Sequence, residues 1–242
     1  APNPGAPQSN DRGQLTRSTC LEGDVCLGNL VFERVLSIGG ATGTQYLPTR
    51  IRIGADASAR QTILRAKGDI TIGTASSTGD IAASVSGDDL LVQSSQGSIV
   101  MVGASSINGG NNGGQFRVLA ARDLRGPGTL RAGGDAQLGI GGSIDIASLI
   151  TGGQLVTLAQ DGSQAALNQL GVSGSIGISD LLSVGNGDAL LVAPGGISVG
   201  RVIVPNGRTV NFLAANGQAQ LGSGGVAGGG TPQNIYLEGQ SV

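Results

Sequence analysis

The sequence predicts an all-β protein, a parallel β-helix (β-solenoid) in which short strands are wound into stacked coils. Three observations favour this fold. A turn-and-strand unit recurs along the chain, the units are spaced at about twenty residues, and the apolar residues are almost all aliphatic. Together they predict about ten coils of roughly twenty residues each.

The repeated unit begins with glycine, continues with aspartate, serine or a second glycine, and ends in a short apolar alternation. A turn signal followed by period-two alternation is typical of a short strand and not of a helix. The units are GDITI (68–72), GDIAA (79–83), GDDLLV (87–92), GSIVMV (97–102), GDAQLGI (134–140), GSIDI (142–146), GSIGI (174–178), GDALLV (187–192) and GGISV (195–199).

The spacing of these units favours two or three strands in each coil. Gly87 follows Gly68 by 19 residues, whereas Gly142 follows Gly134 by only 8. A short step inside a longer one near twenty is typical of solenoids. At a strand spacing of about 4.8 Å, the coils within residues 25–240 would form a rod of about 50 Å.

The composition fits a thin core with many corners. The chain has 45 glycines and 39% hydrophobic residues, but only three Phe, two Tyr and no Trp. Disordered glycine-rich chains lack such aliphatic content, and collagen needs glycine at every third position. Stacked Ile, Leu, Val and Ala would fill the interior, and glycine would supply the positive φ that the corners need.

Two local structures are expected at the corners. Aspartates that follow a corner glycine should accept hydrogen bonds from nearby backbone amides, as in Asx turns. These are Asp69, Asp80, Asp88 and Asp188. The segment QDGSQAALNQLGV (160–172) is predicted to be one or two helical turns inserted at a corner.

Residues 1–19 are predicted to be a flexible, polar, proline-rich arm, and residues 20–242 the β-helix domain. The arm is either the start of a mature secreted chain or an arbitrary cut. A β-sandwich or barrel with strands every eight to twelve residues is the competing fold, but it would use more aromatics and longer strands.

Cys20 and Cys26 are the only cysteines and lie in the stretch CLEGDVC. A turn at Glu22-Gly23-Asp24 would bring the two thiols together as a disulfide, which fits an oxidising compartment. The alternative is a pair of reduced, half-buried cysteines. No metal site or cofactor is expected, because a zinc site needs about four ligands and the chain has no His.

The net charge of −2 and the scattered basic residues argue against nucleic acid as a partner. No apolar run approaches the roughly 18 residues that a spanning helix needs, so the chain is not expected to span a membrane.

Catalytic groups are sparse, and the chain is predicted not to be an enzyme. Without His, a Ser-His-Asp or Cys-His nucleophile is excluded. The adjacent pair Asp88-Asp89 would point to opposite faces of a strand, so both carboxylates would not reach one substrate. Asp69, Asp88 and Asn108 could stack across coils, which we interpret as a ladder that caps corners. Lys67 is interpreted as a solvated surface residue.

Two further patterns are candidate binding sites. GGSIDIA (141–147) matches the calcium-binding repeats-in-toxin pattern only in part, and a calcium roll needs that motif in tandem. Arg50 and Arg52 share one face of a strand and lie in one of two arginine-rich stretches. They would either line a groove for acidic polysaccharide or form a solvated face.

Three segments resemble the repeats of filamentous-haemagglutinin-like exoproteins, the secreted partners of two-partner secretion systems in Gram-negative bacteria. They are LRAKGDITIGTASSTGDI (64–81), TLRAGGDAQLGI (129–140) and NFLAANGQAQLGSGG (211–225). The resemblance covers residues 60–225. It implies a right-handed parallel β-helix that is secreted or held at the cell surface. Asn3-Pro4-Gly5 is only faintly similar to the Asn-Pro-Asn-Gly motif of the family's secretion domain.

The function expected from these observations is structural: an extracellular β-helical shaft or filament subunit of a bacterial adhesin or biofilm matrix. Its partners would be a host or matrix surface, including polysaccharide, and other copies of the chain stacked end to end. The N-terminal arm and the CLEGDVC turn would cap one end or dock onto a neighbour. The alternative is a carbohydrate-binding or polysaccharide-degrading β-helix, for which five aromatics are a poor supply.

Overall fold

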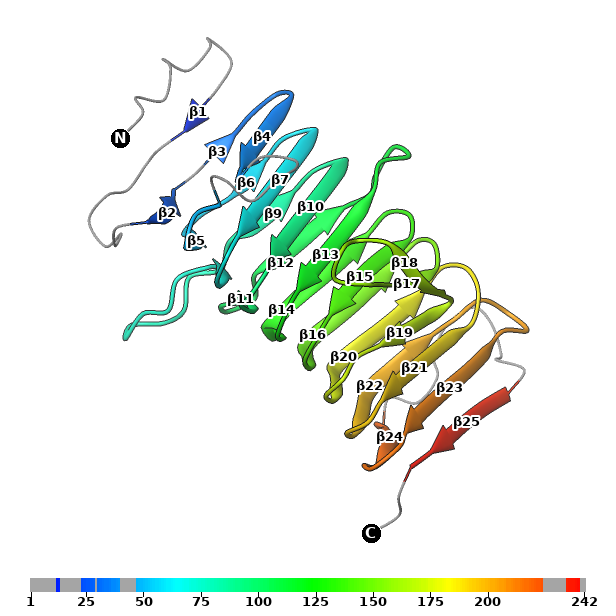
Figure 1. Cartoon of the computed structure of the whole chain (residues 1–242). Coiled ribbons are helices and arrows are strands. Elements are labelled where there is room, and N and C mark those ends of the chain that lie inside the picture. The colour runs from blue at the N-terminus through cyan, green and yellow to red at the C-terminus, as the bar shows by residue number, and fades with distance from the viewer. Residues whose placement is uncertain (1–11, 14–22, 29, 40–46, 224–233, 240–242) are drawn as a thin grey trace.

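The computed structural model describes residues 12–13, 23–28, 30–39, 47–223 and 234–239 and shows an all-β parallel β-solenoid. Short strands cross each coil, and the coils stack along one axis from the blue end to the red end of Figure 1. Strands of successive coils pair in parallel, which confirms the predicted β-helix and excludes the sandwich and the barrel. No helix that could cross a membrane occurs among the described residues.

Each coil has three sides, which we call faces 1, 2 and 3 in chain order. Face 1 holds β2 (Asp24–Leu27), β5 (Arg50–Ile53), β8 (Ile70–Ile72), β11 (Ile99–Met101), the first parts of β14 (Leu124–Ala132), β16 (Ile144–Thr151), β20 (Ile176–Val184) and β22 (Ile197–Ile203), and β24 (Ala219–Leu221).

Face 2 begins as separate short strands and later merges with face 1. Its strands are β1 (Arg12–Gly13), β3 (Leu30–Val31), β6 (Ala57–Ser58), β9 (Ser84–Ser86), β12 (Ser106–Gly109) and the second parts of β14, β16, β20 and β22. In the merged strands a bulge turns the chain from one face to the next, as between Gly126 and Thr129.

Face 3 consists of two sheets in line. The first holds β4 (Val35–Ile38), β7 (Gln61–Ala66), β10 (Asp89–Ser94), β13 (Phe116–Ala120), β15 (Ala136–Ile140), β17 (Leu155–Leu158) and β18 (Gln164–Leu167). The second holds β19 (Gln169–Gly171), β21 (Ala189–Ala193), β23 (Thr209–Ala214) and β25 (Asn234–Glu238).

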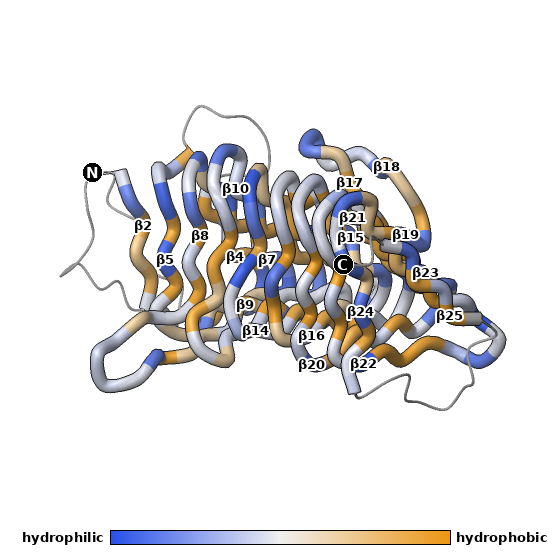
Figure 2. The backbone as a smooth tube through the Cα atoms, turned by 90° about the horizontal axis from the view of Figure 1, so that it is seen from below, coloured by the Kyte–Doolittle hydropathy of each residue, from blue (hydrophilic) through white to orange (hydrophobic). Residues whose placement is uncertain are grey.

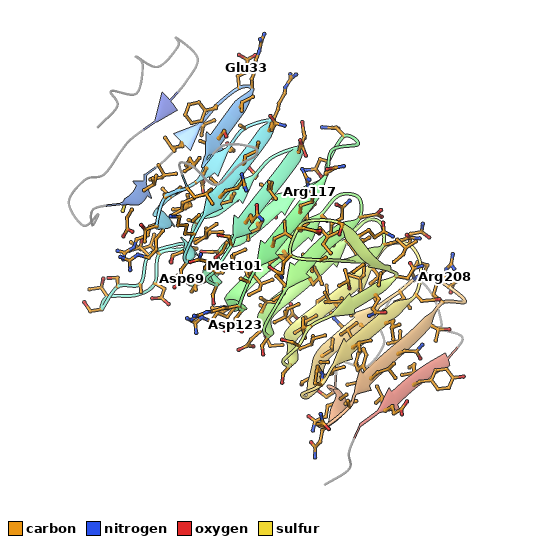
Figure 3. The ribbon with its side chains drawn as sticks, viewed as in Figure 1. Glu33, Asp69, Met101, Arg117, Asp123 and Arg208 are labelled. Atoms are coloured by element: carbon orange, nitrogen blue, oxygen red, sulfur yellow. The ribbon has the colours of Figure 1, made fainter. Side chains whose placement is uncertain are left out.

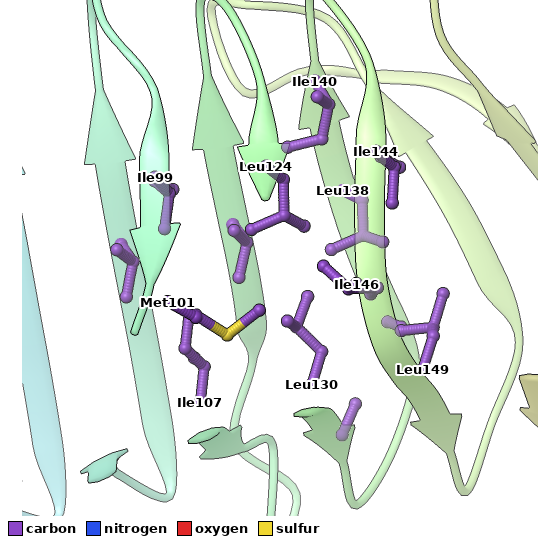
Figure 4. Close-up of a cluster of buried hydrophobic side chains, with 14 of the residues drawn as sticks. Ile99, Met101, Ile107, Leu124, Leu130, Leu138, Ile140, Ile144, Ile146 and Leu149 are labelled. Atoms are coloured by element: carbon purple, nitrogen blue, oxygen red, sulfur yellow. The ribbon is translucent and has the colours of Figure 1, made fainter. Parts of the chain in front are cut away.

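The inward side chains form columns along the stack. Apolar and polar residues alternate along each strand, and the inward positions are apolar (Figure 2), where Figure 4 shows them packed between coils. One column of face 1 is at most 1% exposed and consists of Ile51, Ile70, Ile99, Leu124, Ile144, Ile176 and Ile197. Each member contacts only the coils before and after it, so stability comes from nearest-neighbour packing.

The coils are fewer and longer than the predicted ten of twenty residues. There are about 9, with ~23 residues in each. Ile70 lies opposite Ile51, 19 residues earlier, whereas Ile176 lies opposite Ile144, 32 residues earlier. Excursions between strands cause the difference; one of them is closed by an antiparallel bridge between Thr74 and Ile81. The spacing of 19 is therefore the length of a coil without an excursion.

The predicted helical insertion at residues 160–172 is wrong. The chain instead turns back as β18, which pairs antiparallel with β17, and returns to the stack as β19. Asp161 holds the turn, because its Oδ1 accepts hydrogen bonds from the amide and hydroxyl of Ser163 at 2.9 and 2.6 Å. These bonds lower the pKa of the Asp161 carboxyl.

Thr157 bridges the break that this hairpin makes in face 3. Its hydroxyl donates to the carbonyl oxygen of Gln169 at 2.7 Å and accepts from the amide of Gly171 at 3.0 Å. One side chain therefore replaces two bonds of the backbone ladder between β17 and β19.

Thr157→Val should lower the free energy of unfolding by about 2 kcal/mol, because both backbone groups lose their partner. Urea titration followed by circular dichroism measures this loss. Thr71→Val, an outward substitution on β8, is the matched control and should cost less than about 0.5 kcal/mol. Equal costs for the two variants would show that the bridge contributes nothing.

The predicted N-terminal arm lies largely outside the described residues. Within it, β1 pairs antiparallel with β3, with Arg12 opposite Val31 and Gly13 opposite Leu30. This pairing covers the outer edge of β3 at the N-terminal end of face 2.

Candidate functional surface

The corner that leads into face 1 carries a ladder of side chains that joins the coils. Asp69 Oδ1 accepts from the amide of Ser98 at 2.8 Å, and Ser98 Oγ accepts from the amide of Asp123 at 3.3 Å. Asp123 Oδ1 accepts from the amide of Ser143 at 2.9 Å, and Ser143 Oγ from that of Ser175 at 3.0 Å. We call these five residues the corner ladder; Figure 3 shows Asp69 and Asp123 along one edge of the stack.

The corner leading into face 3 repeats this arrangement. Asp135 Oδ1 accepts from the amide of Gln154 at 2.8 Å, and Asp188 Oδ1 from the amide of Thr209 at 2.9 Å. The predicted Asx turns are therefore corrected at Asp188 and Asp69. Each carboxylate does accept from a backbone amide, but that amide belongs to the next coil.

The ladder explains why glycine precedes aspartate or serine in the repeated unit. A Cβ at Gly97 would lie 2.5 Å from Asp69 Oδ1, and one at Gly142 would overlap Asp123 Oδ1. The carboxylate of one coil thus occupies the space over the glycine of the next. This pairing of Gly-Asp with a later Gly-Ser is a signal in the sequence that composition and spacing alone did not reveal.

The acidic residues singled out from the sequence do not gather into one site. Asp88 Oδ1 accepts from Asn112 Nδ2 at 3.0 Å in the following coil, and Asp89 Oδ2 from Gln61 Nε2 at 2.9 Å in the preceding one. Asn108 lies on face 2, opposite Ser86 and Arg131, and not above Asp69 or Asp88. The predicted stack of Asp69, Asp88 and Asn108 is therefore wrong.

The arginines are dispersed over the three faces. Arg50 and Arg52 both point outward from β5, as predicted, and Arg50 makes two contacts with the carboxylate of Asp24 at 3.0 and 3.1 Å. Arg117 lies on face 3, whereas Arg125 and Arg131 lie on faces 1 and 2 of the merged strand β14. No single groove collects the two arginine-rich stretches. Lys67 is exposed, as expected for a solvated lysine.

The largest polar hollow among the described outer surfaces of face 1 measures about 500 Å³. Small residues make it: Gly177 and Ser198 lie between the longer side chains of Asp145 and Gln220. Asp145 is the one carboxylate that lines it. It is also the acid of the partial calcium motif, and no group of three metal-binding side chains occurs among the described residues.

Cys26 is a buried residue of β2, in register with Arg52 of β5. Cys20 lies outside the described residues, so the Cys20–Cys26 disulfide stays a prediction. Counting thiols with a maleimide before and after reduction would test it.

No protein-family model, curated protein or solved structure matches this chain. The class that the fold defines is the parallel β-solenoid, in which side chains at corners are bonded to the neighbouring coil.

Proposed function

We propose that this chain is a structural shaft: a secreted or surface-held β-solenoid that serves as a rigid spacer in a bacterial adhesin or biofilm matrix. The observation that supports it is the use of its polar corner residues. The corner ladder and the Asp135–Gln154 and Asp188–Thr209 bonds connect one coil to the next. These carboxylates and hydroxyls stabilise the stack and are not gathered around a substrate.

The coil geometry supports rigidity along the axis. Each interior strand is hydrogen-bonded on both sides, and the inward columns run through consecutive coils. About nine coils at a strand spacing of about 4.8 Å give a rod of about 43 Å. Such a rod holds whatever is attached to its ends at a fixed distance.

The secreted location rests on the resemblance to filamentous-haemagglutinin-like exoproteins and on the expected Cys20–Cys26 disulfide, which would persist in an oxidising compartment. A solenoid also suits export of an unfolded chain, because folding can start at one coil and propagate through its neighbours.

Negative-stain electron microscopy of the purified chain, with and without a reducing agent, tests the shaft proposal. We expect straight, unbranched rods one solenoid wide in both conditions. Compact globular particles would contradict it. Rods that collapse on reduction would show that the stack depends on the disulfide and not on coil-to-coil packing alone.

The hollow on face 1 favours a second candidate function, the binding of a polysaccharide. Its hydroxyl, amide and carboxylate groups suit the hydroxyls of a sugar chain lying across coils. One carboxylate does not supply the acid and base of a glycosidase, so binding is favoured over degradation. Saturable binding on a glycan array that is lost in Asp145→Ala would support this candidate and contradict a purely structural role.

A further inference from the structure

The two ends of the solenoid differ in how well their core is covered. In the last described strand, β25, the inward residues Ile235 and Leu237 are 44% and 47% exposed. Their partners one coil earlier, Val210 and Phe212, are both 0% exposed. The inward columns of face 3 therefore end at β25 on an uncovered apolar surface.

The N-terminal end is closed by comparison. The inward residues Leu30 and Leu36 of its first coil are only 6% and 5% exposed. β1 also lies antiparallel along β3 and covers that edge of the sheet. A second coil placed against this end would have to displace β1.

The backbone of β25 is open as well. Its parallel ladder joins it to β23, and no other described strand pairs with its outer edge. An uncovered strand edge with apolar side chains is a template for a further strand. The surface at β25 is thus the continuation of the coil-to-coil interface that runs through face 3.

We infer that this end binds a second copy of the chain, tail to tail, with the two β25 strands antiparallel about a two-fold axis at Tyr236. Residues directly opposite in an antiparallel pair lie on the same side of the sheet. Ile235 then meets Leu237 of the second copy, Asn234 meets Glu238, and Tyr236 meets its own equivalent.

The sequence of β25, Asn-Ile-Tyr-Leu-Glu, is self-complementary in this register. A shift by one residue would set inward side chains opposite outward ones, which a buried face does not tolerate. A shift by two keeps the faces but pairs fewer of the five residues. An interface that uses the same patch on both copies closes after two subunits.

Head-to-tail stacking into a filament is disfavoured by the same observations, because it would join the open C-terminal end to an end that β1 already covers. The inference rests on the solenoid fold and the two ends, and not on the proposed shaft function. Single rods in the microscope would therefore overturn the pairing and leave the shaft proposal intact.

Sedimentation equilibrium of the whole chain over a range of concentrations tests the inference. We expect a reversible dimer, at twice the chain mass of 23.8 kDa. Leu237→Glu should weaken it by about 100-fold, because a carboxylate would be buried between two strands. Val35→Glu, at an exposed apolar residue of the opposite end, should leave the dimer unchanged. A monomer at every concentration, or species larger than dimers, would overturn the inference.

A crosslink tests the register without relying on a disruptive substitution. Opposite residues of an antiparallel pair have Cα atoms about 5 Å apart, which suits a disulfide. Tyr236→Cys should therefore give a covalent dimer on mild oxidation. The unaltered chain and Asn211→Cys, one coil inward in the same outward column, should stay monomeric on a non-reducing gel. Equal crosslinking of all three proteins would contradict the two-fold register.

Discussion

Gly126→Ala is expected to destabilise the solenoid by more than about 4 kcal/mol, the range reserved for a severe local conflict. Gly126 has a φ of 119°, which side chains rarely adopt. A Cβ at this position would overlap the carbonyl oxygen of Met101 and lie 2.8 Å from its carbonyl carbon. The oxygen is backbone in a packed neighbouring coil, so neither atom has room to move.

The same side chain shows why glycine suits this place. Met101 is 1% exposed, and its sulfur would lie 2.6 Å from a Cβ built on Gly128. Figure 4 shows the methionine side chain extended among the inward residues near Leu130. The flexible methionine fills the space that the glycines of β14 leave empty.

Gly113→Ala is the matched control for this prediction. Its φ of 81° is also positive, but a Cβ at this position would have no other atom within 4 Å. The control should cost only the strain of the left-handed region, about 1 kcal/mol. Thermal and urea unfolding of both variants measure the difference. Similar losses for the two would mean that crowding between coils at Gly126 does not matter.

Phe116→Ala is expected to cost about 4 kcal/mol, because it would leave a cavity in the thin core. Phe116 is fully buried on β13, opposite Leu90 in one neighbouring coil and Ala136 in the other. The small Ala136 accommodates the ring, so no neighbouring side chain is large enough to fill the space after truncation.

The loss should first appear close to Phe116, because each coil contacts only its neighbours. Amide hydrogen exchange should rise in β10, β13 and β15 before it rises near β2 or β24. Phe32→Ala, a partly buried ring in the first coil, is the control and should cost about half as much or less. Uniform exchange throughout the chain would contradict nearest-neighbour stabilisation.

The strands could be predicted from the sequence because the repeated unit carries its own turn. Gly68-Asp69 and Gly142-Ser143 each precede a face 1 strand, β8 and β16, as the alternation indicated. The number of coils could not be predicted, because excursions such as the one between Thr74 and Ile81 leave no mark on the strand pattern. The hairpin at β18 was missed for the same reason.

The polar contacts were harder to predict, since they depend on coil register. Thr62 is fully buried, and its hydroxyl donates to the carbonyl oxygen of Ser86 at 2.6 Å. Nothing local distinguishes it from an outward threonine such as Thr71. Likewise, Ile63 and Leu91 are outward residues of face 3 that are buried in a second small cluster. Simple alternation had no means of identifying it.

The most direct test of the account is to lengthen the solenoid by whole coils. Residues 176–196 form one coil without an excursion, since Ile197 lies opposite Ile176. Four extra copies of this segment, inserted in tandem after Gly196, should lengthen the rod by about 19 Å with no change in width. Four copies of only its first ten residues are the control and should disrupt the register and the fold.

Small-angle X-ray scattering gives the maximum dimension and cross-section of each protein, measured at a concentration where the chain is monomeric. The account predicts that the maximum dimension grows by one strand spacing for each added coil and that the cross-section stays constant. A whole-coil insertion that unfolds the protein, or that widens the particle without lengthening it, would contradict the claim that this chain is a modular shaft.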